Sequence, residues 1–206
     1  MKIRSISWLL LLLAVVGTGV TSPAIAQFSP SYKFLESVRK KEAEEVTDAV
    51  SQPGSTIINT QDSSSGDTAL HIVVARRDPA WLGFLLAKGA DPNIANNKGV
   101  TPLMLASNLG LVDAVELLVE HGARLNDADS SGETPLITAV HRHDLVVMRM
   151  LMKAGADPDR ADSSGRSARD YAAFDGPQSP LVAEIKANAR AAGSGTAGQH
   201  SYGPKL

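Results

Sequence analysis

Apolar positions along the chain fall into short runs that alternate with segments rich in glycine, proline, asparagine and serine. In "GVTPLMLASNLG" (99–110), Leu103, Leu105 and Ala106 start a short apolar run that indicates a helix. The next segment, "LVDAVELLVEHG" (111–122), places apolar residues three and four apart, on one face of a second helix. The residues of that face are Ala114, Val115, Leu118 and Val119. The pattern predicts pairs of short helices.

The polar residues between the runs predict where each helix begins and ends. Thr101 can cap the N-terminus of the first helix, and Pro102 suits its first turn, where no backbone N–H is needed. Gly110 breaks the first helix, and Gly122 ends the second, as a residue in the left-handed conformation would. The segment "ARLNDADSSGE" (123–133) then returns the chain, extended and turning, to the next unit.

The same punctuation recurs with a period of 33 residues. Four series keep this spacing: Gly66, Gly99, Gly132 and Gly165; Gly89, Gly122 and Gly155; Thr68, Thr101, Thr134 and Ser167; and Leu70, Leu103 and Leu136. Coincident series at one period predict a repeat protein, whose helix pairs bury their apolar faces by stacking on one another. An aromatic content of only 4%, with abundant Ala, Leu and Val, also favours packed helices over sheets.

A turn followed by two antiparallel helices every 33 residues resembles the ankyrin repeat. The resemblance rests on "GDTALHIVV", "GVTPLMLAS" and "GETPLITAV", each followed by "GADPN", "GARLN" or "GADPD". We count full repeats at 64–96, 97–129 and 130–162. The resemblance implies an all-α solenoid of helix-turn-helix units joined by hairpin-like β-turn loops. It also implies that partner proteins bind along a concave groove.

Capping units are expected at both ends of the stack. The unit at 163–192 keeps "SSGRSARDYAAFDG", but Arg169 and Asp170 replace the central Leu and His, as suits a terminal unit that faces water. Upstream, 27–63 contains two short predicted helices and a long return loop, and it resembles an N-terminal capping unit. The Gly/Ala/Ser-rich tail, 193–206, is predicted to be disordered.

Residues 1–26 have the pattern of a secretory signal peptide. Lys2 and Arg4 give a basic start, Trp8 to Val20 are apolar, and "AIA" ends at Ala26 with the small residues that signal peptidase reads. The alternative is an uncleaved membrane anchor, but the apolar run is short for a span. We therefore expect cleavage near Ala26 and a periplasmic or secreted protein that has no further contact with the membrane.

Charge and cysteine content narrow the classes of partner. Lys2 and Arg4 leave with the signal peptide, so 18 of the 20 basic residues remain against 22 acidic ones, a net charge of −4. This mild acidity, without a dense Lys/Arg block, argues against nucleic-acid binding. The chain has no cysteine, so packing alone must stabilise it in an oxidising compartment. We expect a monomer.

The sequence carries no catalytic motif, and we expect neither enzymatic activity nor a cofactor. It has no nucleophile elbow, no His-Glu-x-x-His motif, no Walker loop and no thiol. His71 lies in "TALH", where the ankyrin family uses histidine to hydrogen-bond neighbouring turns, and Met104 and Ile137 replace it in the next two units. Asp91, Asp157 and Asp159 could suggest paired carboxylates, but they follow the period of the return loops, so turn formation explains them better.

His121, His141 and His143 are the strongest candidate metal site. A His-x-His pair does not bring both rings to one side of a helix, and no carboxylate completes a site. We therefore predict no bound metal and keep a metal-assisted enzyme built on these histidines as an alternative. "GSGTAG" (193–198) fits a phosphate-loop pattern but lacks the preceding strand and the following helix.

Partner contacts are expected where the repeat leaves the sequence variable, at the turn tips and on the exposed side of each first helix. The candidates are Asp67, Arg76, Arg77, Asn97, Lys98, Val100, Asn108, Leu109, Glu133, His141 and Arg142. Arg77 and His143 replace a glycine that is usual in the family, beside Arg76 and Arg142. We predict a groove for a protein segment, with an acidic one favoured because arginine binds carboxylates in bidentate fashion. A solvated face without a partner, and an accessory or inhibitor of a periplasmic enzyme, stay open as alternatives.

Overall fold

The computed structural model describes residues 29–193. The predicted signal peptide (1–26) lies outside the described residues, as does the predicted tail (193–206) beyond Gly193. The described part of the chain forms ten α-helices and the short 3₁₀ helix η1 (Ile57–Asn59). No helix in this part is both long enough and apolar enough to cross a membrane.

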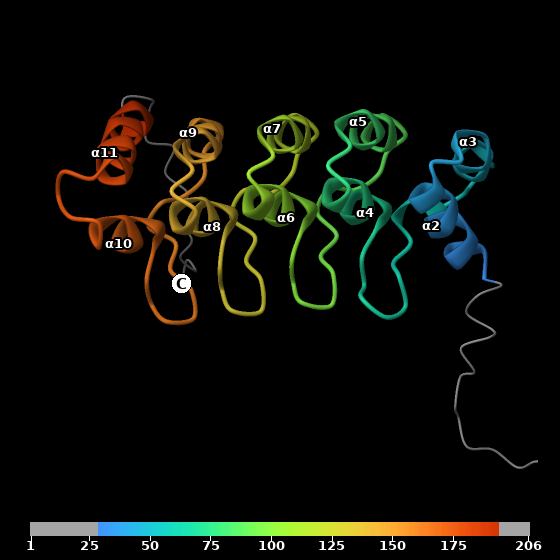
Figure 1. The fold of residues 1–206 in the computed structure, drawn as a ribbon, viewed down its shortest axis with the longest axis horizontal. Coiled ribbons are helices and arrows are strands. Elements are labelled where there is room, and N and C mark those ends of the chain that lie inside the picture. The colour runs from blue at the N-terminus through green and yellow to red at the C-terminus, as the bar shows by residue number, and fades with distance from the viewer. Residues whose placement is uncertain (1–28, 194–206) are drawn as a thin grey trace, which may run out of the picture.

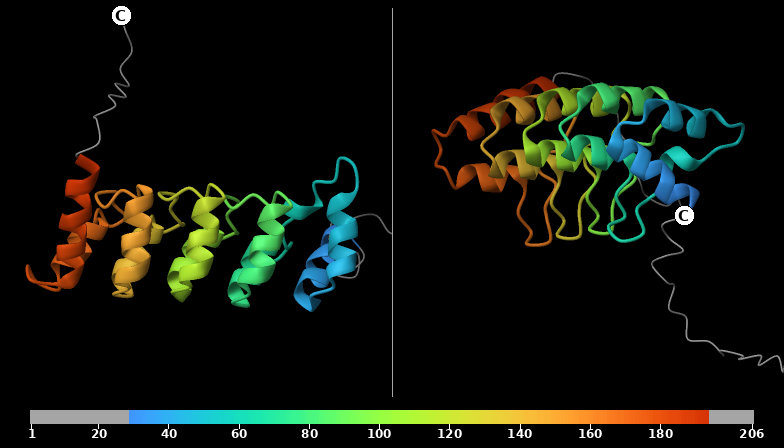
Figure 2. Two further views of the ribbon diagram at one scale, coloured as in Figure 1. Left: turned by 90° about the horizontal axis from the view of Figure 1, so that it is seen from above. Right: turned by 45° about the vertical axis from the view of Figure 1, so that its right-hand side comes forward.

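The helices form two layers (Figure 1). One layer contains α2 (Pro30–Lys40), α4 (Ala69–Ala75), α6 (Pro102–Leu109), α8 (Pro135–His141) and α10 (Ala168–Ala173). The other contains α3 (Ala43–Ser51), α5 (Pro79–Ala87), α7 (Val112–Glu120), α9 (Leu145–Ala154) and α11 (Pro180–Gly193). Apart from α3 and α5, neighbouring helices of a layer pack side by side, so the molecule is an elongated stack of helix pairs (Figure 2). This arrangement confirms the predicted all-α solenoid.

Two-armed loops, which we call fingers, extend beyond the first-helix layer between successive units (Figure 1). A backbone hydrogen bond of 2.9–3.1 Å joins the two arms of each finger. The four bonds run from Asp62 N to Asp67 O, Asn96 N to Val100 O, Asp129 N to Glu133 O, and Asp162 N to Arg166 O. These bonds make the connections hairpin-like, as the sequence predicts.

Neighbouring fingers lie so close together that the tip glycine of every finger except the last has no room for a side chain. Ser130 N donates a hydrogen bond to Lys98 O in the preceding finger at 3.1 Å. A Cβ added to Gly99 would lie 2.9 Å from Ser130 N, and the φ of Gly99 is 76°. Gly165 in the last finger has a φ of 78°, but nothing described lies within 4 Å of its added Cβ. Backbone conformation therefore explains the last glycine, while close approach also explains the earlier ones.

The first helices begin where the sequence predicts. Thr101 Oγ1 accepts a hydrogen bond from Met104 N at 3.3 Å, and Pro102 follows the cap directly. Thr134 Oγ1 accepts from Ile137 N at the same distance. Each of these contacts satisfies a backbone N–H that has no partner within the helix.

The repeated leucine is the centre of the core. Leu70, Leu103 and Leu136 are at most 1% exposed. In the terminal unit Arg169 takes this position, and its guanidinium pairs with Asp159 at 2.6 Å. The stack therefore ends in a surface ion pair where another unit would bury a leucine.

The turn after each first helix contains a residue in the left-handed conformation. These residues are Lys41, Arg77, Gly110, His143 and Gly176, with φ between 54° and 91°. The sequence indicates glycine here from Gly110, and the structure shows that Arg77 and His143 adopt the same backbone despite their side chains. The left-handed conformation costs a non-glycine residue about 1 kcal/mol of conformational free energy.

Asparagine side chains join the return loops of neighbouring units. Asn59 Oδ1 accepts from Asp91 N at 2.8 Å, Asn93 Oδ1 from Arg124 N at 2.7 Å, and Asn126 Oδ1 from Asp157 N at 2.9 Å. Within the loops, the Asp157 carboxylate accepts from Asp159 N at 2.9 Å, which confirms the turn-forming role predicted for it. The repeated "N" of "GADPN" is thus a contact between units.

Candidate partner-binding surface

We define the finger face as the side chains that the first helices and the fingers present at equivalent positions of each unit. Its helical positions are Ile72, Leu105, Thr138 and Tyr171; Ala75, Asn108, His141 and Phe174; and Arg76, Leu109, Arg142 and Asp175. Its finger positions are Asp67, Val100, Glu133 and Arg166, together with the tip residues Asn97 and Lys98. All of these side chains except Thr138 are half-buried or exposed.

The predicted partner contacts lie on the finger face or, for Arg77, at its edge. The exposed ones are Arg77, Asn97, Lys98, Asn108, His141 and Arg142. The half-buried ones are Asp67, Arg76, Val100, Leu109 and Glu133. The repeat register therefore brings the predicted residues to one side of the stack. Only some of them are exposed enough to contact a ligand freely.

The guanidinium of Arg76 is not free, although the sequence predicts that it is available to a partner. Its Nη1 donates to Val38 O at 2.7 Å and to Arg39 O at 3.2 Å, at the C-terminal end of α2. Its Nη2 lies 3.3 Å from Asp78 Oδ2, and the side chain is only 21% exposed. Arg76 thus joins the N-terminal capping unit to the first repeat, and its guanidinium is already engaged within the chain.

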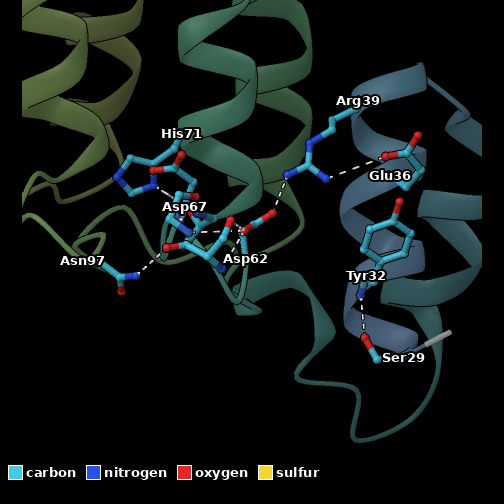
Figure 3. Close-up of polar contacts among 11 residues, drawn as sticks. Ser29, Tyr32, Glu36, Arg39, Asp62, Asp67, His71 and Asn97 are labelled. Atoms are coloured by element: carbon cyan, nitrogen blue, oxygen red, sulfur yellow. Dashed lines mark hydrogen bonds and ion pairs between the residues drawn. The ribbon is translucent and has the colours of Figure 1, made fainter. Parts of the chain in front are cut away.

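The finger nearest the N-terminus is held by side chains from both neighbours (Figure 3). Arg39 on α2 donates to Asp62 Oδ2 at 2.7 Å and lies 3.7 Å from Glu36. The Ser64 hydroxyl, backbone N–H groups and Arg39 together hold the pKa of Asp62 well below its usual range. This end of the finger face is therefore a fixed, charged framework.

Two predicted contacts at this end also have internal partners. Asp67 accepts a hydrogen bond from Asn96 Nδ2 at 2.9 Å, and Asn97 Nδ2 donates to Ser64 O at 3.0 Å. Both bonds cross from one finger to the next, so they hold the fingers in register. Lys98, by contrast, is exposed, and its ammonium makes no salt bridge within residues 29–193.

His71 has the structural role that the sequence predicts (Figure 3). Its Nδ1 lies 3.1 Å from Thr68 N, which can only donate, so the ring proton is on Nε2. Nε2 then donates to Val100 O of the next finger at 2.9 Å. Burial lowers the pKa of His71, which keeps the ring neutral.

The opposite end of the finger face carries an aromatic cluster that our sequence reasoning did not identify. The cluster consists of His141, Tyr171 and Phe174, with Arg166 above it. The His141 and Tyr171 rings meet edge to face with centroids 4.3 Å apart, and those of Tyr171 and Phe174 are 6.0 Å apart. The Arg166 guanidinium lies 5.6 Å from the centre of the Phe174 ring.

Hydrogen bonds fix two members of this cluster. Tyr171 donates its hydroxyl to Asp162 Oδ2 at 2.6 Å, and this bond contributes most to a pKa of Asp162 well below its usual range. His141 Nδ1 lies 3.3 Å from Glu133 Oε1, which also accepts from Thr138 Oγ1 at 2.8 Å. The predicted residues His141 and Glu133 are therefore partners of each other.

The sequence matches a known family over most of its described length. The match is to ankyrin repeats (3 copies), and it covers residues 39–129 and, overlapping them, 70–162. The chain belongs to the ankyrin-repeat family. Ankyrin repeats are protein–protein interaction modules and generally act as binding scaffolds without catalysis.

The candidate metal histidines are separate in this ankyrin stack. His121 Nδ1 lies 2.8 Å from Leu117 O, whereas His143 Nε2 lies 2.7 Å from Asp175 Oδ2 and His141 contacts Glu133. No group of three or more His, Cys, Asp or Glu side chains within the described residues is placed to hold a metal ion.

The ankyrin register itself contained the signal for the missed residues. Tyr171 and Phe174 follow Thr138 and His141 by 33 residues, so they occupy finger-face positions in the terminal unit. The predicted partner contacts end with the third full repeat, and 163–192 is treated there as a cap only. Extending the same register by one unit places Phe174 among these contacts, whereas Tyr171 is equivalent to Thr138, which is not among the predicted contacts.

Proposed function

We propose that this ankyrin-repeat protein acts without catalysis, by binding a segment of a partner protein on the finger face. The observation that carries the proposal is the change of chemistry at equivalent exposed positions. One such position holds Ala75, Asn108, His141 and Phe174 in successive units, whereas the core and capping positions stay nearly constant. Variable side chains on a constant framework are what a specific binding surface needs.

The rigidity of the framework supports the same function. Backbone bonds between fingers, such as Ser130 N to Lys98 O, and the asparagine contacts between return loops fix each unit relative to the next. A surface that is ordered before binding loses little conformational entropy when its partner arrives. Binding energy is then available for recognition of the partner.

The proposed site of action is the periplasm or the medium, after cleavage near Ala26. The support is the basic, apolar and small-residue pattern of residues 1–26. N-terminal sequencing of the protein recovered from the exported fraction tests this proposal, and we expect the mature chain to begin at Gln27. Recovery of the uncleaved chain from the membrane fraction would contradict it.

The binding proposal is tested by capture of partners from the exported fraction with the mature chain. The test variant is the double substitution Lys98→Glu and Asn108→Arg on the finger face, and the control is Glu116→Lys on the exposed side of α7. We expect mass spectrometry to find a protein that is lost with the test variant and kept with the control. Equal capture by all three proteins would exclude the finger face.

The same experiment separates the alternatives. If the captured protein is an enzyme and the mature chain changes its rate, the finger face serves an accessory or inhibitory role. Metal analysis of the purified protein addresses a site built on His121, His141 and His143. Tightly bound zinc in a one-to-one ratio would contradict the proposal of a scaffold without catalysis.

A further inference from the structure

Phe174 is more exposed than its chemistry favours. Its side chain is 69% exposed, compared with 37% for Tyr32 and 52% for Val146, the other exposed large apolar residues of the described chain. Phe174 shares its repeat position with Asn108 and His141, so it belongs to the finger face. An exposed aromatic ring on a binding surface is a typical contact of high energetic weight.

The missing neighbour at the end of the stack accounts for only part of this exposure. His141, at the equivalent position, packs on Tyr171 of the following unit with ring centroids 4.3 Å apart and is still exposed. Phe174 contacts Tyr171 of the preceding helical turn and Arg166 of its own finger. The ring therefore belongs to the cluster on the side of the stack.

The cluster is held in place before any ligand binds. Tyr171 is fixed through its hydroxyl bond to Asp162 at 2.6 Å, and it supports Phe174 on one side and His141 on the other. Arg166 covers one part of Phe174, with its guanidinium 5.6 Å from the ring centre. A fixed group of aromatic side chains can receive an apolar side chain at a low entropy cost.

The charges around the cluster favour an acidic ligand. Its carboxylates already have internal partners: Glu133 has Thr138 and His141, Asp162 has Tyr171 and Ser164, and Asp175 has His143. Arg142 and Arg166 are exposed, and neither forms a salt bridge to any described residue. The carboxylates keep their negative charge, but their oxygens are engaged within the chain, so Arg142 and Arg166 are the charged groups left free to pair with a ligand.

We propose that the aromatic cluster is the anchor point of the finger face, and that it binds an acidic partner segment carrying one aromatic or aliphatic side chain. The apolar side chain packs on Phe174 and Tyr171, and flanking carboxylates pair with Arg166 and Arg142. This inference rests on the proposed function and adds to it the place and the chemistry of recognition.

A displayed library of random 12-residue peptides, selected on the mature chain, is the probe for this proposal. We expect the selected peptides to carry an aromatic or large aliphatic residue flanked by Asp or Glu. Their affinity should fall about 10-fold or more in Phe174→Ala, and about 3- to 10-fold in Arg166→Gln and in Arg142→Gln. Lys88→Gln is the matched control, because Lys88 lies 5.9 Å from the Phe84 ring in the other helix layer.

Each other outcome contradicts a specific part of the proposal. Peptides that bind Phe174→Ala normally, but are lost with Asn108→Arg, leave the proposed function intact and overturn the anchor. Selection of basic peptides overturns the charge assignment, and a dimer in sedimentation velocity that Phe174→Ala dissociates makes a second copy the ligand. If no peptide is enriched, or if every finger-face variant binds normally, both proposals fail. Phe174→Tyr keeps the ring, so retained affinity there separates loss of packing from misfolding.

Discussion

Both ring nitrogens of His71 are hydrogen-bonded, and the side chain is 1% exposed. Nδ1 accepts from Thr68 at the start of its own helix, and Nε2 donates to Val100 of the next unit. Protonation of Nδ1 would break the hydrogen bond that this atom accepts from Thr68 N. Burial therefore lowers the pKa of His71, and the neutral ring links two units.

We expect this histidine to make the fold sensitive to mild acid. The pKa of His71 is lower in the folded than in the unfolded state, so stability is complete above about pH 6.5 and falls below it. The loss is at most about 1.4 kcal/mol for each pH unit. Urea denaturation between pH 7.5 and 5 should show a smaller loss in His71→Met, which copies Met104 of the next unit. His121→Gln, at an exposed histidine, should lose as much unfolding free energy between pH 7.5 and 5 as the wild type. An equal loss in His71→Met would show that His71 is not the source of the acid sensitivity.

Ser107 is a second residue whose surroundings predict a measurable effect. Its side chain is fully buried, and its Oγ has no hydrogen-bond partner in the described structure. Val74 and Val140 occupy the equivalent positions of the neighbouring units. We expect Ser107→Ala to raise the free energy of unfolding by about 1 kcal/mol, because an unsatisfied hydroxyl leaves the core. Ser130→Ala, at an exposed serine, should change it by less than about 0.5 kcal/mol. A destabilised Ser107→Ala would mean that the hydroxyl has a partner.

At the scale of the element, the left-handed turn between the two helices of a unit sets the direction of the second helix. Lys41, Arg77 and His143 adopt this turn without the freedom of glycine. Lys41 gains a salt bridge there, to Asp78 at 2.8 Å, and His143 Nε2 lies 2.7 Å from Asp175 Oδ2. Arg77 has φ 58° and no salt bridge within the described chain, so nothing visible offsets its backbone strain.

Arg77→Gly should therefore stabilise the protein by about 1 kcal/mol in urea denaturation. His143→Gly is the matched comparison, and we expect a smaller gain because that change also removes the contact with Asp175. The reverse change, Gly110→Ala at the same turn, should destabilise by about 1 kcal/mol or more. Loss of stability in Arg77→Gly would show that the arginine makes a favourable contact in solution.

At the scale of the whole molecule, the sequence predicts what depends on local chemistry within one period. Thr101 and Gly110 mark the limits of a helix because a cap and a left-handed turn act within a few residues. The role of Arg76 was not predictable in this way, because its acceptors, Val38 O and Arg39 O, belong to the capping unit. That unit departs from the period: Lys41 and Arg77 occupy equivalent turns but are 36 residues apart.

The sequence predicts where the candidate surface lies. It does not predict which side chains of that surface already have hydrogen-bond partners within the chain. The register places Asp67 and Asn97 on the finger face, yet only the structure shows that Asn96 and Ser64 already bind them. The packing of Tyr171 between His141 and Phe174 also depends on contacts across two units. Such contacts follow from the stacking of units and not from the pattern within one of them.

Contacts between fingers should therefore contribute a measurable share of the stability of the stack, and the glycine series allows this share to be isolated. Gly99 and Gly165 have nearly the same φ, 76° and 78°, but only Gly99 has a neighbouring finger against its α-carbon. Both Gly99→Ala and Gly165→Ala carry the backbone cost of a left-handed alanine, about 1 kcal/mol.

Gly99→Ala should cost about 1–3 kcal/mol more than Gly165→Ala, because its Cβ would lie 2.9 Å from Ser130 N and force the two fingers apart. Urea denaturation of both variants measures the difference, which cancels the common backbone cost. In a one-dimensional stack, weakening one junction also lowers cooperativity. We therefore expect a broader transition for Gly99→Ala and an unchanged slope for Gly165→Ala. Equal losses in the two variants would mean that the fingers stack without contributing to the coupling of the units.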